Sequence, residues 1–174
     1  MANTIEKILR SDKKPKEKIS LLTKNIKQTP KLIDELMDYF EVGTNAEKGS
    51  CFEVLKYVSE SNPEIVLPYL DIVIELINDK EPKIRWQTAR VVGNMAKKFP
   101  NKASNAVSNL LTNTKDKGTV VRWCAAFALT EIAKNNPKLQ KELLPKINTL
   151  IKTEQNNGVK NVYIKTLKTI EKKS

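Results

Sequence analysis

The stretch LPYLDIVIELINDKEPKIRWQTARVVGNMA, residues 67–96, contains the pattern that decides the fold. Up to Ile77 it is apolar over most of a helical surface, as expected of a helix buried on two sides. After a turn at 79–82, apolar or small side chains recur at steps of three and four, at Ile84, Thr88, Val91, Val92 and Met95. This spacing is typical of an amphipathic helix. The stretch therefore predicts two helices joined by a short turn.

The same scheme recurs along the chain. Prolines at positions 30, 63, 100 and 137 are spaced 33, 37 and 37 residues apart, and each opens a new apolar-periodic run. Proline fits the first turn of a helix but cannot continue a preceding helix, so each one marks a boundary between helices. The tripeptide 84–86, Ile-Arg-Trp, returns 37 residues later as Val-Arg-Trp at 121–123. The chain is therefore built from a helical repeat of about 37 residues.

Residues 67–96 resemble the HEAT repeat, whose pattern is an apolar helix, an Asp in the turn, then Val-Arg and small residues. Asp79 and Arg85 are six residues apart, as are Asp116 and Arg122. The resemblance implies that these four residues form a ladder of hydrogen bonds that links adjacent repeats. An Arg fork can bond a turn acid and the carbonyl groups that helix ends leave unpaired.

The resemblance is strongest over 63–136. In the second repeat, Val42 and Lys48 stand where the Asp and Arg are expected, and in the last repeat Glu154 and Lys160 keep the six-residue spacing. Tetratricopeptide and ankyrin units fit less well, because the tryptophans lie in the second helix of each pair and the chain has no His. Armadillo units have a third short helix, for which about 37 residues leave little room.

We therefore predict an all-α, right-handed solenoid of about five HEAT-like helix pairs, forming a single domain over residues 1–174. The repeats are placed at 1–29, 30–62, 63–99, 100–136 and 137–174. The helices are placed at 3–10, 15–28, 30–42, 45–61, 64–78, 82–98, 101–113, 118–135, 138–153 and 157–172.

The composition argues against an enzyme. Without His there is no imidazole base and no Ser-His-Asp or Cys-His arrangement. Cys51 and Cys124 fall two repeats apart, too far for a disulfide and too few for a zinc site, so we expect both to be free and buried. No phosphate-binding glycine motif occurs. We predict no catalytic residues, no metal and no cofactor, and no small-molecule substrate is evident.

The net charge of +11 is spread unevenly, with +5 in residues 1–29, −4 in 30–62 and +6 in 137–174. A positive field attracts nucleic acid, anionic membranes or acidic proteins, although a coding bias toward Lys would give the same charge. No apolar run is long enough to span a membrane, and the first residues lack the apolar core of a secretory signal. We expect a cytoplasmic monomer that does not associate with membranes.

In a HEAT solenoid the second helices line the concave side, and their exposed positions start one residue after the ladder Arg. The predicted partner-binding residues are Trp86, Arg90, Lys97, Trp123, Phe127, Lys134 and Lys165, and the same spacing also places Gly93 and Thr130 on this side. Exposed Trp beside Arg is typical of a binding hot spot. The other interpretation is that both tryptophans lie flat over neighbouring helices and cover Lys and Arg stems.

The sequence thus favours a non-enzymatic scaffold that binds a protein or peptide partner on its concave face. The alternative is a nucleic-acid-binding protein that is similar to the HEAT-like alkylpurine DNA glycosylases. Those enzymes use Trp residues and an Asp on the concave face. Here Arg90 and Phe127 follow the tryptophans one turn later, so an evident catalytic acid is lacking.

Overall fold

The computed structural model describes residues 3–174, and every regular element in that range is helical. Residues 1 and 2 of the predicted domain lie outside the described part. The elements are α1 (Thr4–Leu9), α2 (Pro15–Gln28), α3 (Leu32–Val42), α4 (Asn45–Ser61), α5 (Pro63–Val66), η1 (Leu67–Tyr69), α6 (Leu70–Glu75), η2 (Leu76–Asn78), α7 (Pro82–Ala96), α8 (Pro100–Ala103), η3 (Ser104–Ala106), α9 (Val107–Asn113), α10 (Thr119–Asn135), α11 (Pro137–Thr153) and α12 (Asn157–Glu171).

The predicted all-α fold of paired helices is confirmed, and α2 and α4 have the predicted bounds. The helices predicted over 64–78 and 101–113 are present, but 3-10 turns interrupt both. In the first, Pro68 lies in η1 and has no N–H for a helical hydrogen bond. In the second, the Ser104 hydroxyl donates to the carbonyl of Asn101 at 2.5 Å, which competes with regular backbone pairing.

Several helices begin with strong local signals. Thr44 caps α4: its hydroxyl accepts from the backbone N–H of Glu47 at 3.3 Å, and the Glu47 carboxylate accepts from the N–H of Thr44 at 2.8 Å. Asn156 caps α12 by accepting from the N–H of Val159 at 3.1 Å. Proline occupies the first turn of α2, α5, α7, α8 and α11. Three of the four regularly spaced prolines, Pro63, Pro100 and Pro137, are among these, whereas Pro30 lies in the turn before α3.

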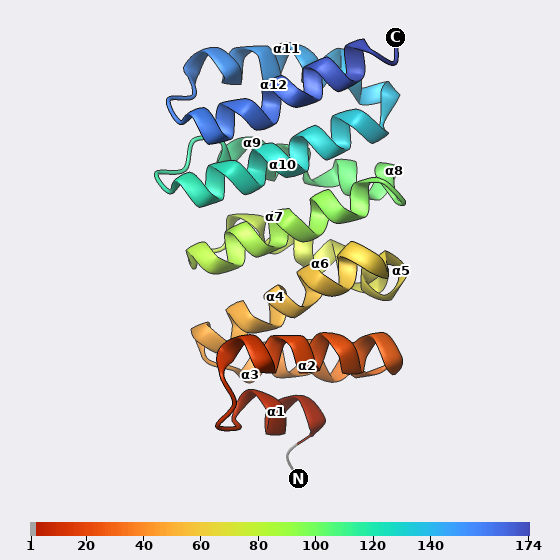
Figure 1. Cartoon of the computed structure of the whole chain (residues 1–174), viewed down its shortest axis with the longest axis vertical. Helices are drawn as coiled ribbons and strands as arrows, with labels where there is room; N and C mark the ends of the chain where they lie inside the picture. The colour runs from red at the N-terminus through yellow and green to blue at the C-terminus, as the bar shows by residue number, and fades with distance from the viewer. Residues whose placement is uncertain (1–2) are drawn as a thin grey trace. The chain divides into compact units, whose positions relative to one another are not determined.

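The chain divides into two compact units, one up to Tyr69 and one from Leu70 to Ser174. In the first unit, α1 packs on α3, and α2 packs on α4 (Figure 1). Its core contains an edge-to-face contact between Phe40 and Phe52, whose ring centroids are 5.0 Å apart. Leu22, Leu36 and Leu55 of the same unit are fully buried.

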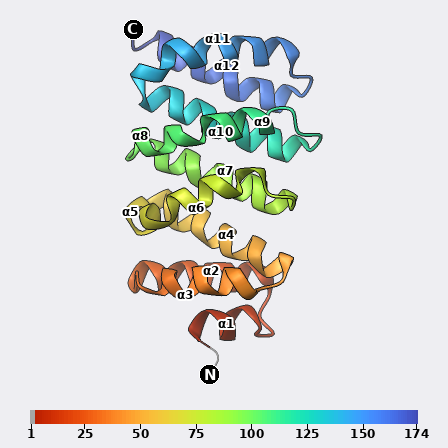
Figure 2. The same ribbon diagram turned by 180° about the vertical axis from the view of Figure 1, so that it is seen from behind.

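The second unit has two layers. Helices α7, α10 and α12 form one layer, with α10 packed between the other two (Figure 1). Helices α6, α8, α9 and α11 form the other layer, as the opposite view shows (Figure 2). In the α7–α10 contact, Gly93 of α7 lies against the backbone of Ala128 of α10, which is fully buried. None of the helices in residues 3–174 is both long and apolar enough to cross a membrane.

Candidate partner-binding face

An arginine contact fixes the register of α7 against the next turn of the second unit. The Arg85 Nη1 donates to the carbonyl oxygens of Asp79 at 2.8 Å and Lys80 at 2.9 Å. Its Nε lies 3.1 Å from Oδ2 of Asp116, in the following repeat. Both side chains are mostly buried, with 14% and 15% exposed. Arg85 therefore joins its own turn to the next one.

Arg122 makes the same contact one repeat later. Its Nη1 donates to the carbonyls of Asp116 at 2.9 Å and Lys117 at 3.2 Å. Its Nε and Nη2 donate to the two oxygens of Glu154 at 2.9 and 3.3 Å, a bidentate pair. Glu154 thus holds the place of the turn Asp.

Each turn acid has a second role inside its own turn. Asp116 accepts from the N–H of Gly118 at 2.7 Å, and Glu154 accepts from the N–H of Asn156 at 2.8 Å. Burial raises the pKa of Glu154, but the hydrogen bonds from Arg122 and from the backbone outweigh it, so its pKa is lowered overall. The side chain of Asp79 accepts from the N–H of Glu81 at 2.8 Å, while only its carbonyl contacts Arg85.

The other layer contains a set of asparagine hydrogen bonds that the sequence analysis missed. The Asn113 amide donates to the carbonyl of Ile77 at 2.7 Å, and Asn109 donates to the carbonyl of Ile74 at 3.1 Å. Asn78 donates to the side chain of Asn113 at 2.8 Å. Asn78 and Asn113 are 35 residues apart, two fewer than the 37-residue repeat, so the repeat pattern did not indicate this pair. These bonds satisfy carbonyls around the irregular η2.

The outward side of α7, α10 and α12, here called the second-helix face, carries the predicted partner-binding residues. At its centre the rings of Trp123 and Phe127 are stacked, with centroids 6.0 Å apart and planes 5° apart. The Arg90 guanidinium of α7 lies over both rings, 5.3 Å from the Trp123 centroid and 4.6 Å from that of Phe127. Arg90 therefore orders both rings across the helix boundary.

Gly93 allows this arrangement. A Cβ at position 93 would lie 2.3 Å from Cε1 of Phe127 and 3.2 Å from Cα of Ala128. Glycine thus permits α10 to approach α7 closely with the Phe127 ring lying across it. The prediction that Gly93 and Thr130 lie on the exposed side is wrong, because both residues are buried. The close approach of α10 covers Gly93, and the Thr130 hydroxyl donates to the carbonyl of Phe127 at 2.9 Å.

The remaining predicted residues surround this cluster. Trp86 is half-buried on α7, and within residues 3–174 it makes no ring contact with Trp123. Lys97 and Lys165 are exposed, and Lys134 forms an ion pair with Glu131 on its own helix. The face therefore combines half-buried aromatic rings with cationic groups.

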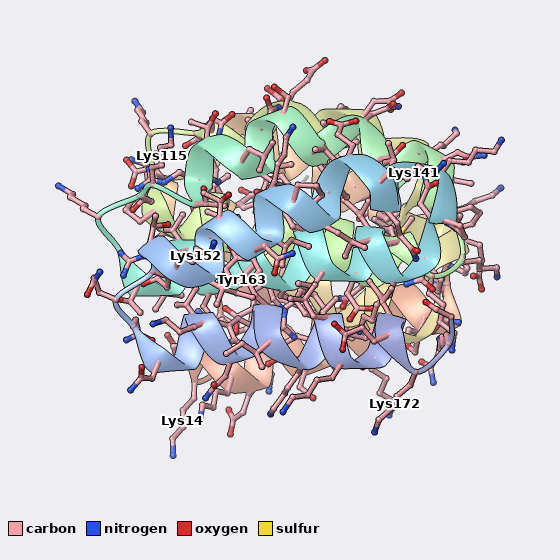
Figure 3. The ribbon with its side chains drawn as sticks, turned by 90° about the horizontal axis from the view of Figure 1, so that it is seen from above. Lys14, Lys115, Lys141, Lys152, Tyr163 and Lys172 are labelled. Carbon is pink, nitrogen blue, oxygen red and sulfur yellow. The ribbon has the colours of Figure 1, made fainter. Side chains whose placement is uncertain are left out.

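The basic residues of the last repeat project in several directions. Viewed from above, Lys141 and Lys152 on α11 and Lys172 after α12 extend outward, while Tyr163 points into the protein (Figure 3). Tyr163 is 1% exposed, and burial raises its pKa. Lys141, Lys152 and Lys172 do not follow a single line across the second unit (Figure 3).

The described residues contain no group of three or more His, Cys, Asp or Glu side chains placed to hold a metal ion. Cys51 and Cys124 are both buried thiols. Burial raises the pKa of Cys51 to about 12, which keeps it protonated and poorly nucleophilic.

Comparison with known proteins bears on this architecture. The family model described as Cnd1, non-SMC mitotic condensation complex subunit 1, matches residues 57–173. An engineered protein has a TM-score of 0.74 at 18% identity, over 97% of this chain and 80% of its own. A designed armadillo repeat protein in complex with the peptide (KR)4 has a TM-score of 0.71 at 16% identity, over 92% of this chain and 77% of its own. No curated protein sequence matches the chain. The structural likeness shows a helical-repeat fold.

Proposed function

The chain belongs to the Cnd1 family, non-SMC mitotic condensation complex subunit 1, and from this membership we propose that it is a non-enzymatic scaffold that binds a segment of a partner protein on the second-helix face. The observation that carries the proposal is the stack of Arg90 on Trp123 and Phe127. Ordered aromatic and Arg side chains lose little entropy on binding and are typical of hot spots. The cytoplasmic location and the monomeric state remain predictions from the sequence.

The charge of the face indicates the chemistry of the segment. Arg90, Lys97, Lys134 and Lys165 all contribute positive charge, partly offset where Glu131 pairs with Lys134. The designed armadillo protein binds an alternating Lys-Arg peptide. A peptide of that kind would be repelled here, so we propose an acidic segment with an apolar or aromatic anchor.

Peptide selection on the intact chain tests this proposal. A random displayed-peptide library selected against the wild type should enrich sequences with acidic residues beside an aromatic one. Trp86→Ala with Trp123→Ala should lower the affinity of the enriched peptides by about tenfold or more, since aromatic hot spots contribute about 2 kcal/mol to binding. Lys97→Glu with Lys165→Glu, both at exposed positions, should lower the affinity of the enriched peptides while the protein remains folded.

The matched control is Lys138→Glu with Lys141→Glu, which makes the same charge change at exposed positions of α11 in the other layer. It should leave the affinities unchanged. If the enriched peptides bind the double Trp variant and the K97E/K165E variant as well as the wild type, the second-helix face is not the binding site.

Nucleic acid is the second candidate partner, favoured by exposed Lys165, Lys168 and Lys172 along one side of α12. Binding to a mixed DNA or RNA pool would then fall steeply between low and moderate salt, because each phosphate contact releases a counterion. The divergent lysines of the last repeat favour the protein partner (Figure 3). If the protein does not retain nucleic acid at low salt, nucleic acid is excluded as its partner.

A further inference from the structure

A groove of about 760 Å³ lies between α2 and α4 of the first unit. Its apolar lining includes Ile19 on α2 and Tyr57 on α4, and Tyr57 is 39% exposed although it is a large aromatic residue. The two helices pack together but diverge toward their C-terminal ends (Figure 1). The lining follows α2 from Lys16 to Gln28, roughly 18 Å at the rise of a helix. The groove is long enough for about three turns of a docked helix.

The two sides of the groove carry opposite charges. On the α2 side, Lys16, Lys24 and Lys27 are exposed, and their spacing of eight and three residues aligns them along one side of the helix. None of these three lysines forms an ion pair with another residue of 3–174. On the α4 side, the lining includes Glu53 and Glu60, which both have partners among the described residues, and the ammonium group of Lys56 lies 3.7 Å from the centroid of the Tyr57 ring.

We propose that this groove binds an amphipathic helix of a partner protein, with acidic residues along one flank and basic residues along the other. Apolar side chains at helical spacing would contact Ile19 and Tyr57. The acidic flank would lie along the lysines of α2, and the basic flank along Glu53 and Glu60. A nucleic acid would meet repulsion from these glutamates. The inference goes beyond the proposed function, since it concerns different residues in the other unit and a ligand with charges of both signs.

The order of the charges also fixes the direction of the docked helix. When an amphipathic helix is turned end for end with its apolar side kept down, its two flanks change places. Only one direction then brings acidic residues to α2 and basic residues to α4. The groove therefore selects the direction of its ligand by electrostatics rather than by shape.

Three synthetic helical peptides of about 14 residues, roughly four turns, test the proposal by fluorescence anisotropy. All share leucines at the same positions, and their flanks carry Glu and Lys on opposite sides, only Glu, or only Lys. The peptide with both signs should bind the intact chain most tightly. Each single-sign peptide should bind about fivefold more weakly, because rim charges each make modest contributions.

Variants locate the site. Ser20 is exposed in the groove lining, so Ser20→Trp should block the groove and abolish binding. Lys24→Glu with Lys27→Glu should weaken the peptide with both signs by about tenfold. The matched control, Lys13→Glu with Lys31→Glu, makes the same charge change at exposed residues outside the lining and should leave the affinity unchanged.

The proposal is overturned if no peptide binds, if all three bind equally, or if K24E/K27E binds like its control. Circular dichroism checks whether S20W folds. If S20W does not fold, the peptide affinity of K24E/K27E tests the proposal. Loss of binding in W86A/W123A but not in K24E/K27E would assign the peptides to the second-helix face instead. A wild-type dimer that becomes monomeric on Ser20→Trp would show that a second copy occupies the groove, which also overturns the proposal.

Discussion

The α7–α10 pair in the second unit and the α2–α4 pair in the first unit are equivalent second helices of neighbouring repeats, yet they pack differently. Between α7 and α10, Gly93 and small buried side chains allow close approach, and Arg85 reaches the acid of the next turn. Between α2 and α4 a groove opens. The comparison suggests that close stacking of repeats needs both a small residue at the contact and an acid in the following turn.

The first unit contains only half of the arginine contact. Lys18 on α2 donates to the carbonyl of Leu9 at 2.7 Å, as Arg85 does to the carbonyls of its own turn. The residue in the following turn is Val42, which is 77% exposed and has no side-chain acceptor. Lys48, at the Arg position of α4, lies over the ring of Phe40 at 5.2 Å. The bond within the repeat is kept, and the bond to the next repeat is absent.

The largest effect is expected from breaking the arginine contact in the second unit. Arg122→Ala leaves the carboxylate of Glu154, which is 7% exposed, without its main counter-charge, and it frees two turn carbonyls. The free energy of unfolding should fall by about 3 kcal/mol, measured by urea denaturation. Lys115→Ala, at an exposed residue of the preceding turn, is the control and should change it by less than about 0.5 kcal/mol. Equal free energies of unfolding for the two variants would show that the Arg122–Glu154 contact does not stabilise the packing of the repeats.

A smaller loss is expected when the helices are forced apart at Gly93. Gly93→Val should lower the free energy of unfolding by about 2 kcal/mol, because the added carbons meet the ring of Phe127 and the backbone at Ala128. Adding Phe127→Ala should restore part of this loss, which a double-mutant cycle would measure. Hydrogen exchange should show faster exchange in α7 and α10. Strict additivity of the two substitutions would contradict the close approach.

The smallest expected change in the free energy of unfolding concerns Glu47 in the first unit and depends on pH. The pKa of Glu47 is lowered to about 2, first by the hydrogen bond from the hydroxyl of Tyr39 at 2.6 Å and then by bonds from Thr44. A lowered folded-state pKa adds stability above the ordinary value near 4.5, and this stability is lost as the pH falls toward about 2.

Because Glu47 is 21% exposed, the contribution should be about 1–2 kcal/mol. The difference in unfolding free energy between wild type and Glu47→Gln should be greatest near neutral pH and shrink between pH 4.5 and 2. A difference that stays constant over this range would contradict the assignment. Glu17→Gln, in the first turn of α2, gives the matched comparison for a more exposed acid.

Much of the fold could be predicted because it depends on local patterns. The steps of three and four residues predicted the bounds of α2 and α4, and the spaced prolines predicted the starts of α5, α8 and α11. Of the four predicted ladder residues, Asp79 contacts Arg85 through its carbonyl and not through its carboxylate. Periodicity could not show the breaks at η1 and η3, because 3-10 turns preserve an apolar pattern over a few residues.

The candidate site was less accessible to sequence reasoning. Helical phase groups Trp86 with Gly93, but the burial of Gly93 depends on how closely α10 approaches. The placement of Arg90 over Trp123 and Phe127 depends on rotamers that neighbouring side chains select. The groove between α2 and α4 depends on the angle between two helices, which no residue pattern within either helix specifies.

The arginine contacts also determine where this protein can be cut and joined. The sequence repeats begin at the prolines, but the ion pair of Arg85 is with Asp116, beyond the boundary at Pro100. A cassette of 63–99 moved into another helical-repeat protein would leave behind the acid that Arg85 requires. Exchangeable modules should therefore be cut after the turn acid, from about residue 80 to 116, so that each arginine is transferred together with the acid of the following turn.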